Sequence, residues 1–428
     1  MNRSLLATGL ISLSATMLAA CSQNYTGGLS LGLDDNQSVK RYQEFKQQRE
    51  QRIATQKRLD QLSGVAVDFG GDQPSHRVTE YADSRGGQSR LASASNDLMG
   101  MFGHLPNRGG MEAGGAQTPM DGNPDARRLT QTFAGSDYDP ATDRSGQWLV
   151  YASTRHRERP DIYKKQIGAS PVMQLTDDPA DDRMPAFSPD GQYVAFTSNR
   201  SGNYDIYIMN ADGGPARQLT HTSTDDIHPS FSPDGSQLVY SSYGSASGLY
   251  EMVVIDLKQP TMKKFIGYGL FPQWSPTDNR ILYQRARERG SRLFSVWQIT
   301  LMDDGTVTSP MEVVAANNAA AITPSWSPDG NYIVFCTVID PHAEDQSRLT
   351  KADLWVMNAD GSGKARVTSG SYAFTQPTWA ADGSIMFVSN RGNSGLENVW
   401  SIRPDKALKL TAPGENEARS ASVMVPAQ

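Results

Sequence analysis

This chain of 428 residues has few of the residues that build disulfide frameworks and metal sites, with only two cysteines and six histidines. Two cysteines allow at most one disulfide, and Cys336 stands in an apolar segment where we expect a small buried side chain. The histidines are scattered, and the closest pair, His221 and His228, lacks metal-ligand spacing. No motif therefore predicts a resident metal or cofactor.

Catalytic motifs and basic charge are scarce as well. The chain contains no paired Cys-x-x-Cys, His-Glu-x-x-His or phosphate loop. A Gly-x-Ser-x-Gly string at residues 28–32 directly follows the N-terminal apolar segment, whereas a nucleophile elbow needs a hydrolase sheet. The formal net charge of −6 and the pI of about 5.6 disfavour nucleic-acid binding. The sequence thus predicts a protein that is not an enzyme.

One apolar run occurs at the N-terminus, between Leu5 and Ala20. It is shorter than the roughly 20 residues that cross a bilayer as a helix, so it predicts a secretion signal over residues 1–20. The run ends in a Leu-Ala-Ala-Cys sequence that resembles the bacterial lipoprotein cleavage box. This resemblance implies that Cys21 is lipidated, and Ser22 implies anchoring in the outer membrane, with the remaining chain on its periplasmic face. The alternative is an ordinary secretion signal with an incidental cysteine.

A short internal repeat fills most of the remaining chain. A proline recurs at intervals of 43 to 53 residues, each time just before a turn related to Ser-Pro-Asp-Gly, at Pro140, Pro185, Pro229, Pro272, Pro324 and Pro377. Units of roughly 40–50 residues are typical of propeller blades. The sequence therefore predicts an all-β fold over residues 126–428, a six-bladed β-propeller of four-stranded blades.

The second repeat shows how one blade is encoded. Ser188–Gly191 predicts a turn, because proline presets φ, aspartate bonds its own backbone and glycine accepts a positive φ. Tyr193–Ser198 alternates aromatic and β-branched residues and predicts a strand, as does Asp205–Asn210. Ala216–Thr220 predicts the outer strand, and related outer strands are expected at residues 174–176, 366–368 and 409–411.

The Ser-Pro-Asp-Gly turn, the Asp-Ile-Tyr strand and the Arg-Gln-Leu-Thr edge together resemble the repeats of TolB-type six-bladed propellers, over about residues 126–428. Related repeats also occur in propellers attached to prolyl-oligopeptidase-like hydrolases and in some sugar lyases. Two segments can supply the strand that closes the ring: Arg127–Thr130 before the first repeat, and Lys409–Thr411 after the last.

Residues 21–125 differ in character from the repeats and predict a tether. The stretch 34–62 predicts a helix with a weak apolar stripe, which favours a solvated helix over a partner-binding one. Residues 84–123 are rich in Gly, Ser, Asn and Met and predict disorder. TolB-type proteins carry a compact α/β domain before the propeller, and this region lacks that pattern.

The candidate site lies just before the innermost strands, where a propeller gathers its loops around one mouth of the central channel. These loops are acidic in the first three repeats and apolar in the last three, at 269–270, 321–322 and 373–374. Converging carboxylates can bind a divalent cation or a basic peptide, and a half-apolar rim favours a peptide. The alternative is that these aspartates only cap turns. The predicted partner-binding residues are Asp137, Asp139, Asp181, Asp182, Arg183, Asp225, Asp226 and His228, and the recurring Arg155, Arg200 and Arg391 are expected to be structural.

Together these patterns predict a lipid-anchored propeller of the bacterial cell envelope that acts as a non-catalytic, protein-binding scaffold. The family resemblance implies a peptidoglycan-associated lipoprotein as the partner and upkeep of the outer membrane as the role. The alternative is a surface carbohydrate-binding or polysaccharide-lyase-type propeller. That alternative needs metal-ligating histidines on the inner strands, and the sequence does not place any there.

Overall fold

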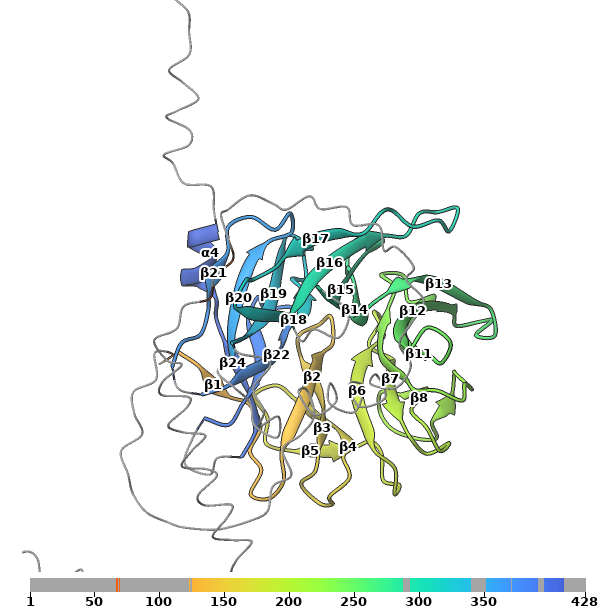
Figure 1. Cartoon of the computed structure of the whole chain (residues 1–428). Helices are drawn as coiled ribbons and strands as arrows, with labels where there is room; N and C mark the ends of the chain where they lie inside the picture. Colours follow the sequence, from red (N-terminus) through yellow and green to blue (C-terminus); the bar gives the residue numbers. More distant parts are fainter. Residues whose placement is uncertain are drawn as a thin grey trace, which may run out of the picture. The chain divides into compact units, whose positions relative to one another are not determined.

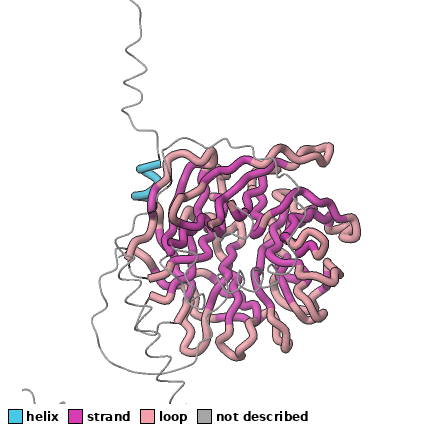
Figure 2. The backbone as a smooth tube through the Cα atoms, viewed as in Figure 1, coloured by secondary structure: helices cyan, strands magenta, loops and turns pink. Residues whose placement is uncertain are grey.

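The computed structural model describes residues 67, 69, 123, 125–287, 293–339, 352–370, 372–391 and 396–411. These residues form six four-stranded antiparallel sheets (Figure 1). The innermost strands of the six sheets contact each other in a closed cycle, β2, β6, β10, β14, β18, β22 and back to β2. The predicted six-bladed propeller is therefore confirmed, and Figure 2 shows that strands dominate the described chain.

Each blade follows the order expected from the repeat. Blade 1 contains β2 (Asp137–Thr142), β3 (Trp148–Ser153), β4 (Asp161–Gln166) and β5 (Val172–Gln174), and blade 2 contains β6 (Asp182–Phe187), β7 (Tyr193–Ser198), β8 (Asp205–Asn210) and β9 (Arg217–Gln218). Blade 3 contains β10 (Asp226–Phe231), β11 (Gln237–Gly244), β12 (Leu249–Asp256) and β13 (Lys263–Tyr268), and blade 4 contains β14 (Leu270–Trp274), β15 (Arg280–Ala286), β16 (Phe294–Thr300) and β17 (Met311–Val314). Blade 5 contains β18 (Ala319–Trp326), β19 (Tyr332–Ile339), β20 (Ala352–Asn358) and β21 (Ala365–Arg366). Blade 6 contains β22 (Phe374–Trp379), β23 (Ile385–Ser389), β24 (Asn398–Ile402) and β1 (Arg127–Arg128).

The strand that closes the ring comes from the N-terminal side. β1 pairs antiparallel with β24, so that Arg127 lies opposite Ser401 and Arg128 opposite Trp400. The prediction of an outer strand at Lys409–Thr411 is therefore wrong. These residues end the helix α4 (Asp405–Thr411), which has an acidic residue in its first turn and a basic one in its last, as the helix dipole favours.

In three blades, a threonine that follows the outer strand connects that strand to the third strand of the same blade by a side-chain hydrogen bond. In blade 1 the Oγ1 atom of Thr176 accepts a hydrogen bond from the backbone N–H of Ile162 at 2.9 Å. Thr220 and Thr368 make the same contact in blades 2 and 5. The hydroxyl supplies an acceptor to a buried strand amide that would otherwise lose its partner at the edge.

Most of the core consists of apolar clusters that join neighbouring blades. One cluster combines Ile206 and Leu238 from blades 2 and 3, and another combines Leu282 and Phe335 from blades 4 and 5. Cys336 is a free, fully buried thiol, as the sequence predicts. A single sheet cannot bury both of its faces, so stacking around the ring supplies the core.

Several predictions concern parts of the chain outside the described residues. The signal segment 1–20, Cys21, the helix at 34–62 and almost all of the tether lie there. Among the residues that are described, no helix combines the length and apolarity needed to cross a membrane.

Candidate binding cavity on the propeller axis

Every innermost strand contains a bulge at the same place. The pairing register between the first and second strands shifts there in all six blades, directly before the repeated proline. The residue before that proline has a positive φ between 47° and 58° in each blade. A bulge redirects the side chain it carries, and proline lacks the N–H that regular pairing would use. The six residues, here called the axial ring, are Asp139, Met184, His228, Phe271, Thr323 and Gln376.

All six axial-ring residues line one cavity of about 400 Å³. Residues of the repeated turns, including Arg144, Pro189, Pro276 and Pro328, line the same cavity. The cavity is also lined by the aromatic residue that precedes each turn in five of the blades: Phe187, Phe231, Trp274, Trp326 and Trp379. The repeated turn is a fold signal in the sequence, and in the structure its residues also line the cavity.

The axial ring has a polar and an apolar side. The Gln376 amide donates to Asp139 Oδ1 at 2.6 Å, while the Asp139 backbone N–H donates to Gln376 Oε1 at 2.9 Å. Across the ring, the His228 imidazole packs edge-on against Phe271, with ring centroids 4.6 Å apart. Burial raises the pKa of Asp139 to about 6 and lowers the pKa of His228 to about 4. At neutral pH the ring therefore carries a carboxylate at Asp139 and, across the ring, a neutral imidazole at His228.

Four buried polar atoms on residues that line the cavity have no hydrogen-bond partner among the described residues. They are His228 Nδ1, Trp274 Nε1, Thr323 Oγ1 and Trp379 Nε1. By contrast, the indole N–H of Trp326 donates to the backbone oxygen of Gln273 at 3.2 Å. Buried donors are nearly always satisfied in folded proteins. The indole N–H groups of Trp274 and Trp379 are thus unused donors on residues that line the cavity.

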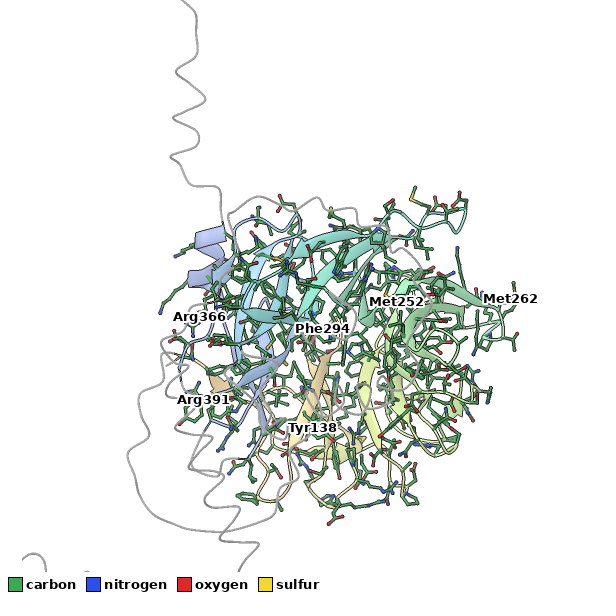
Figure 3. All side chains as sticks on the ribbon, viewed as in Figure 1. Tyr138, Met252, Met262, Phe294, Arg366 and Arg391 are labelled. Carbon is green, nitrogen blue, oxygen red and sulfur yellow. The ribbon has the colours of Figure 1, made fainter. Side chains whose placement is uncertain are left out.

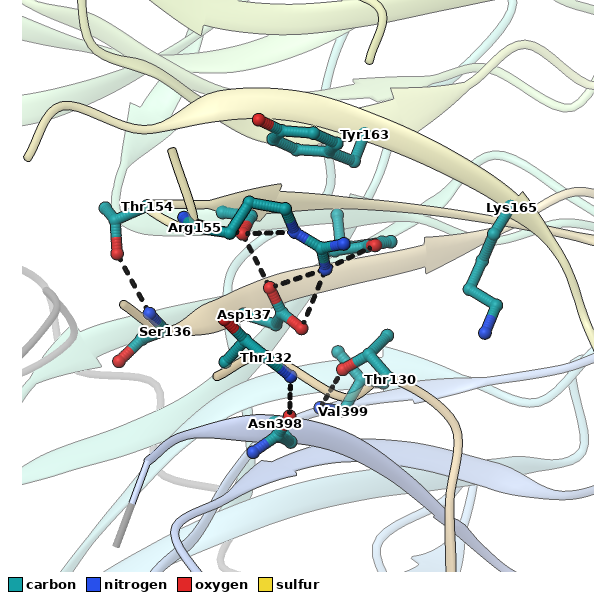
Figure 4. Close-up of polar contacts among 12 residues, drawn as sticks. Thr130, Thr132, Ser136, Asp137, Thr154, Arg155, Tyr163, Lys165, Asn398 and Val399 are labelled. Atoms are coloured by element: carbon teal, nitrogen blue, oxygen red, sulfur yellow. Dashed lines mark hydrogen bonds and ion pairs between the residues drawn. The ribbon is translucent and has the colours of Figure 1, made fainter. Parts of the chain in front are cut away.

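Three of the predicted site residues lie inside the blades. Asp137 accepts hydrogen bonds from Ser153 Oγ at 2.6 Å and from Arg155 Nη2 at 3.0 Å, and its side chain has no exposed surface (Figure 4). Asp182 binds Arg200 in the same way at 2.9 Å, and Asp226 accepts from Ser242 at 2.5 Å. These carboxylates hold strands together and are inaccessible to a partner in this structure.

Of the other five predicted residues, two belong to the axial ring, and three lie at or just before the start of the innermost strands β6 and β10. Asp139 and His228 belong to the axial ring. Arg183 pairs with Asp181 at 2.9 Å, and the same carboxylate accepts from the Tyr204 hydroxyl at 3.0 Å. Asp225 accepts from the Tyr204 backbone N–H at 3.0 Å. Partner binding at this half-buried pair of loops stays a prediction, and so does a bound cation. No group of three or more Asp, Glu, His or Cys side chains in the described ranges is arranged for a metal ion.

The sequence contains a regular pattern at the cavity, and it is distinct from the aspartates that predicted a binding site at the channel mouth. An aromatic residue stands immediately before the turn in five repeats, which is more regular than the aspartates upstream. Periodicity alone does not show which of these side chains face the axis, because the strand bulge changes their direction. The bulge itself depends on pairing with the second strand, which no local pattern reports.

A protein-family model matches residues 157–424, and it describes the tricorn protease N-terminal beta propeller domain. No curated protein matches the sequence. Among solved structures, the chain is similar to a protein described as a TolB from Agrobacterium tumefaciens, with 19% identity and a TM-score of 0.48, over 63% of this chain and 90% of that one. TolB from Acinetobacter baumannii shows 22% identity and a TM-score of 0.46, over 57% of either chain. An oligogalacturonate lyase from Vibrio parahaemolyticus shows 11% identity and a TM-score of 0.46, over 67% of this chain and 96% of that one. These likenesses concern the fold alone.

Proposed function

This chain belongs to the family of the tricorn protease N-terminal beta propeller domain, and from that premise we propose that it is a non-catalytic propeller that binds a segment of a partner protein. The observation that carries the proposal is the axial cavity. It combines apolar and proline-rich walls with the two buried indole donors of Trp274 and Trp379, which have no partner in the described chain. A pocket of this kind fixes orientation with a few polar groups.

A peptide segment suits this cavity for three physical reasons. Backbone carbonyl oxygens of an extended peptide can accept from the indole N–H groups. Apolar side chains gain from burial against Phe231 and the prolines of the turns. The carboxylate of Asp139 lies on the polar side of the ring, where it attracts a basic side chain or a backbone amide.

We further propose that the protein works in the bacterial cell envelope, held by lipid on Cys21 at the outer membrane. The N-terminal signal sequence supports this location, and the TolB-type repeats support an envelope protein such as a peptidoglycan-associated lipoprotein as the partner. In this account the purified protein shows no hydrolase or lyase turnover.

Site-specific photocrosslinking in intact cells tests the proposal. A photoreactive amino acid replaces Arg144, an exposed residue that lines the cavity beside Pro276. The control position is Met262, which is 66% exposed on the outer edge of blade 3 (Figure 3). We expect mass spectrometry to identify one envelope protein crosslinked from position 144 and not from position 262. Equal crosslinking from both positions, or none from position 144, argues against the cavity as the binding site.

A further inference from the structure

In blades 1 and 2, an arginine caps a pair of aromatic rings on neighbouring strands. The Arg155 guanidinium lies 5.4 Å from the Tyr151 ring and 4.9 Å from the Tyr163 ring. Arg200 lies 5.4 Å and 4.7 Å from Phe196 and Tyr207. Each arginine is held by a buried aspartate, as Figure 4 shows for blade 1. The guanidinium thus contacts both rings and forms an ion pair with the buried carboxylate.

Blade 5 has a corresponding aromatic pair but neither the arginine nor the aspartate. Phe335 lies opposite Trp355 in the strand register, as Tyr151 lies opposite Tyr163 in blade 1. Ala321 pairs with Thr337, which is where Asp137 pairs with Ser153. Two residues further along this strand stands Ile339, at the position that Arg155 has after Ser153. The space over these two rings, here called the blade 5 pocket, therefore has apolar neighbours and lacks the guanidinium found in blades 1 and 2.

A side chain from outside the propeller fills this pocket. The Phe69 ring packs edge-on against Trp355 with centroids 4.9 Å apart, and against Phe335 at 6.1 Å. The Lys364 ammonium lies 6.0 Å from the centre of the Phe69 ring. Val67, two residues earlier, packs with Ala316 and Ile339. A phenylalanine thus takes the place that the guanidinium has in blades 1 and 2.

We propose that the blade 5 pocket is a binding site for a short peptide that has an apolar residue followed two positions later by an aromatic one, and that Val67 and Phe69 of this same chain occupy it. Alternate side chains of an extended segment point the same way, so one such segment delivers Val67 and Phe69 together. Edge-on aromatic contacts add to the burial of the ring. We call this contact a latch. It holds Val67 and Phe69 against blade 5, and both residues precede in the sequence the strand β1 that joins blade 6. The inference does not depend on the axial cavity or its partner.

Chymotryptic cleavage of the full-length protein tests the latch directly. Phe133 is 86% exposed and serves as the reference cleavage site within each molecule. We expect cleavage after Phe69 to be about tenfold slower than after Phe133 in the wild type. The double variant Ala321→Asp/Ile339→Arg rebuilds the cap of blade 1 and should abolish this protection. Trp355→Ala removes the nearest ring contact and serves if the double variant does not fold. Equal cleavage at both sites in the wild type would overturn the inference.

A peptide in trans provides the second measurement. A fluorescein-labelled synthetic peptide of residues 63–73 is titrated, up to about 1 mM, into full-length wild type, Phe69→Ala and the matched control Phe133→Ala. We expect binding to Phe69→Ala at least about tenfold tighter than to the other two, since their own segments occupy the pocket. A peptide that carries alanine in place of Phe69 should bind none of the three. Equal binding to all three proteins, or none to Phe69→Ala, contradicts the proposal.

Discussion

The side-chain oxygen of Thr130 accepts a 3.0 Å hydrogen bond from the backbone N–H of Val399, 269 residues further along the chain (Figure 4). This is the contact that Thr176 makes with Ile162 within blade 1. Blade 6 is therefore built like the other blades, except that its outer strand comes from the opposite end of the propeller sequence. The backbone N–H of Leu129 reinforces the joint by donating to the oxygen of Val399 at 2.8 Å.

Replacing Thr130 by valine is expected to lower the free energy of unfolding by about 1–3 kcal/mol, because the buried Val399 amide loses its acceptor. Urea denaturation followed by tryptophan fluorescence measures the change. Thr130→Ser keeps the hydroxyl and is the matched control, with stability closer to the wild type. If the valine variant is as stable as the serine variant, the Thr130 hydroxyl does not stabilise the closure of the ring.

Replacing Arg200 by alanine is expected to cost about 3–5 kcal/mol, since it leaves the fully buried carboxylate of Asp182 without its cation. Arg403→Ala is the control, because the Arg403 side chain is 59% exposed in its pair with Asp382 and such pairs contribute about 1 kcal/mol or less. Both variants are compared by urea denaturation. Similar losses for the two variants would show that Arg200 does not support the blade.

Asp139 is expected to make the propeller less stable as the pH rises. Burial raises its pKa in the folded state from 3.8 to about 6, so the folded protein binds the proton more tightly than the unfolded chain does. Its contribution is most favourable below pH 3.8 and is lost as the pH rises through 6, by up to about 3 kcal/mol. The stability advantage of wild type over Asp139→Asn should therefore shrink between pH 4 and pH 7.

Asp190 provides a control of opposite sign for the pH experiment. Hydrogen bonds from Ser188 and from the backbone of Gln192 lower the pKa of this turn carboxylate. Its contribution is present above the unfolded pKa and is lost as the pH falls through the lower folded value. The advantage of wild type over Asp190→Asn should grow from acid to neutral pH. The same trend for both variants would contradict the burial assigned to Asp139.

The repeated turn and the strands could be predicted from sequence because each depends on local chemistry. Ser188–Gly191 carries the residues that its turn requires, and Tyr193–Ser198 is observed as the strand β7. The identity of the closing strand could not be predicted, since Arg127–Thr130 and Lys409–Thr411 carry similar residues and only long-range pairing separates them.

The candidate site was harder to predict for the same reason. The aspartates at 137 and 182 are conspicuous in the sequence, but their partners Arg155 and Arg200 turn them into structural ion pairs. The direction of the axial-ring side chains depends on a bulge between two strands, which local sequence does not specify. Phe69 belongs to no repeat, so no pattern connects it with the missing arginine of blade 5.

The most direct measurement of the central claim is capture of the crosslinked envelope protein by purified variants of the cavity. Trp274→Phe/Trp379→Phe removes the two unpartnered indole donors, whereas the control Trp326→Phe makes the same reduction in ring size but removes a donor already bonded to the Gln273 oxygen. Affinity is measured by calorimetry with the partner identified through position 144. The account predicts binding weakened by at least about tenfold in the double variant and by much less in the control. Unchanged binding by the double variant would contradict it.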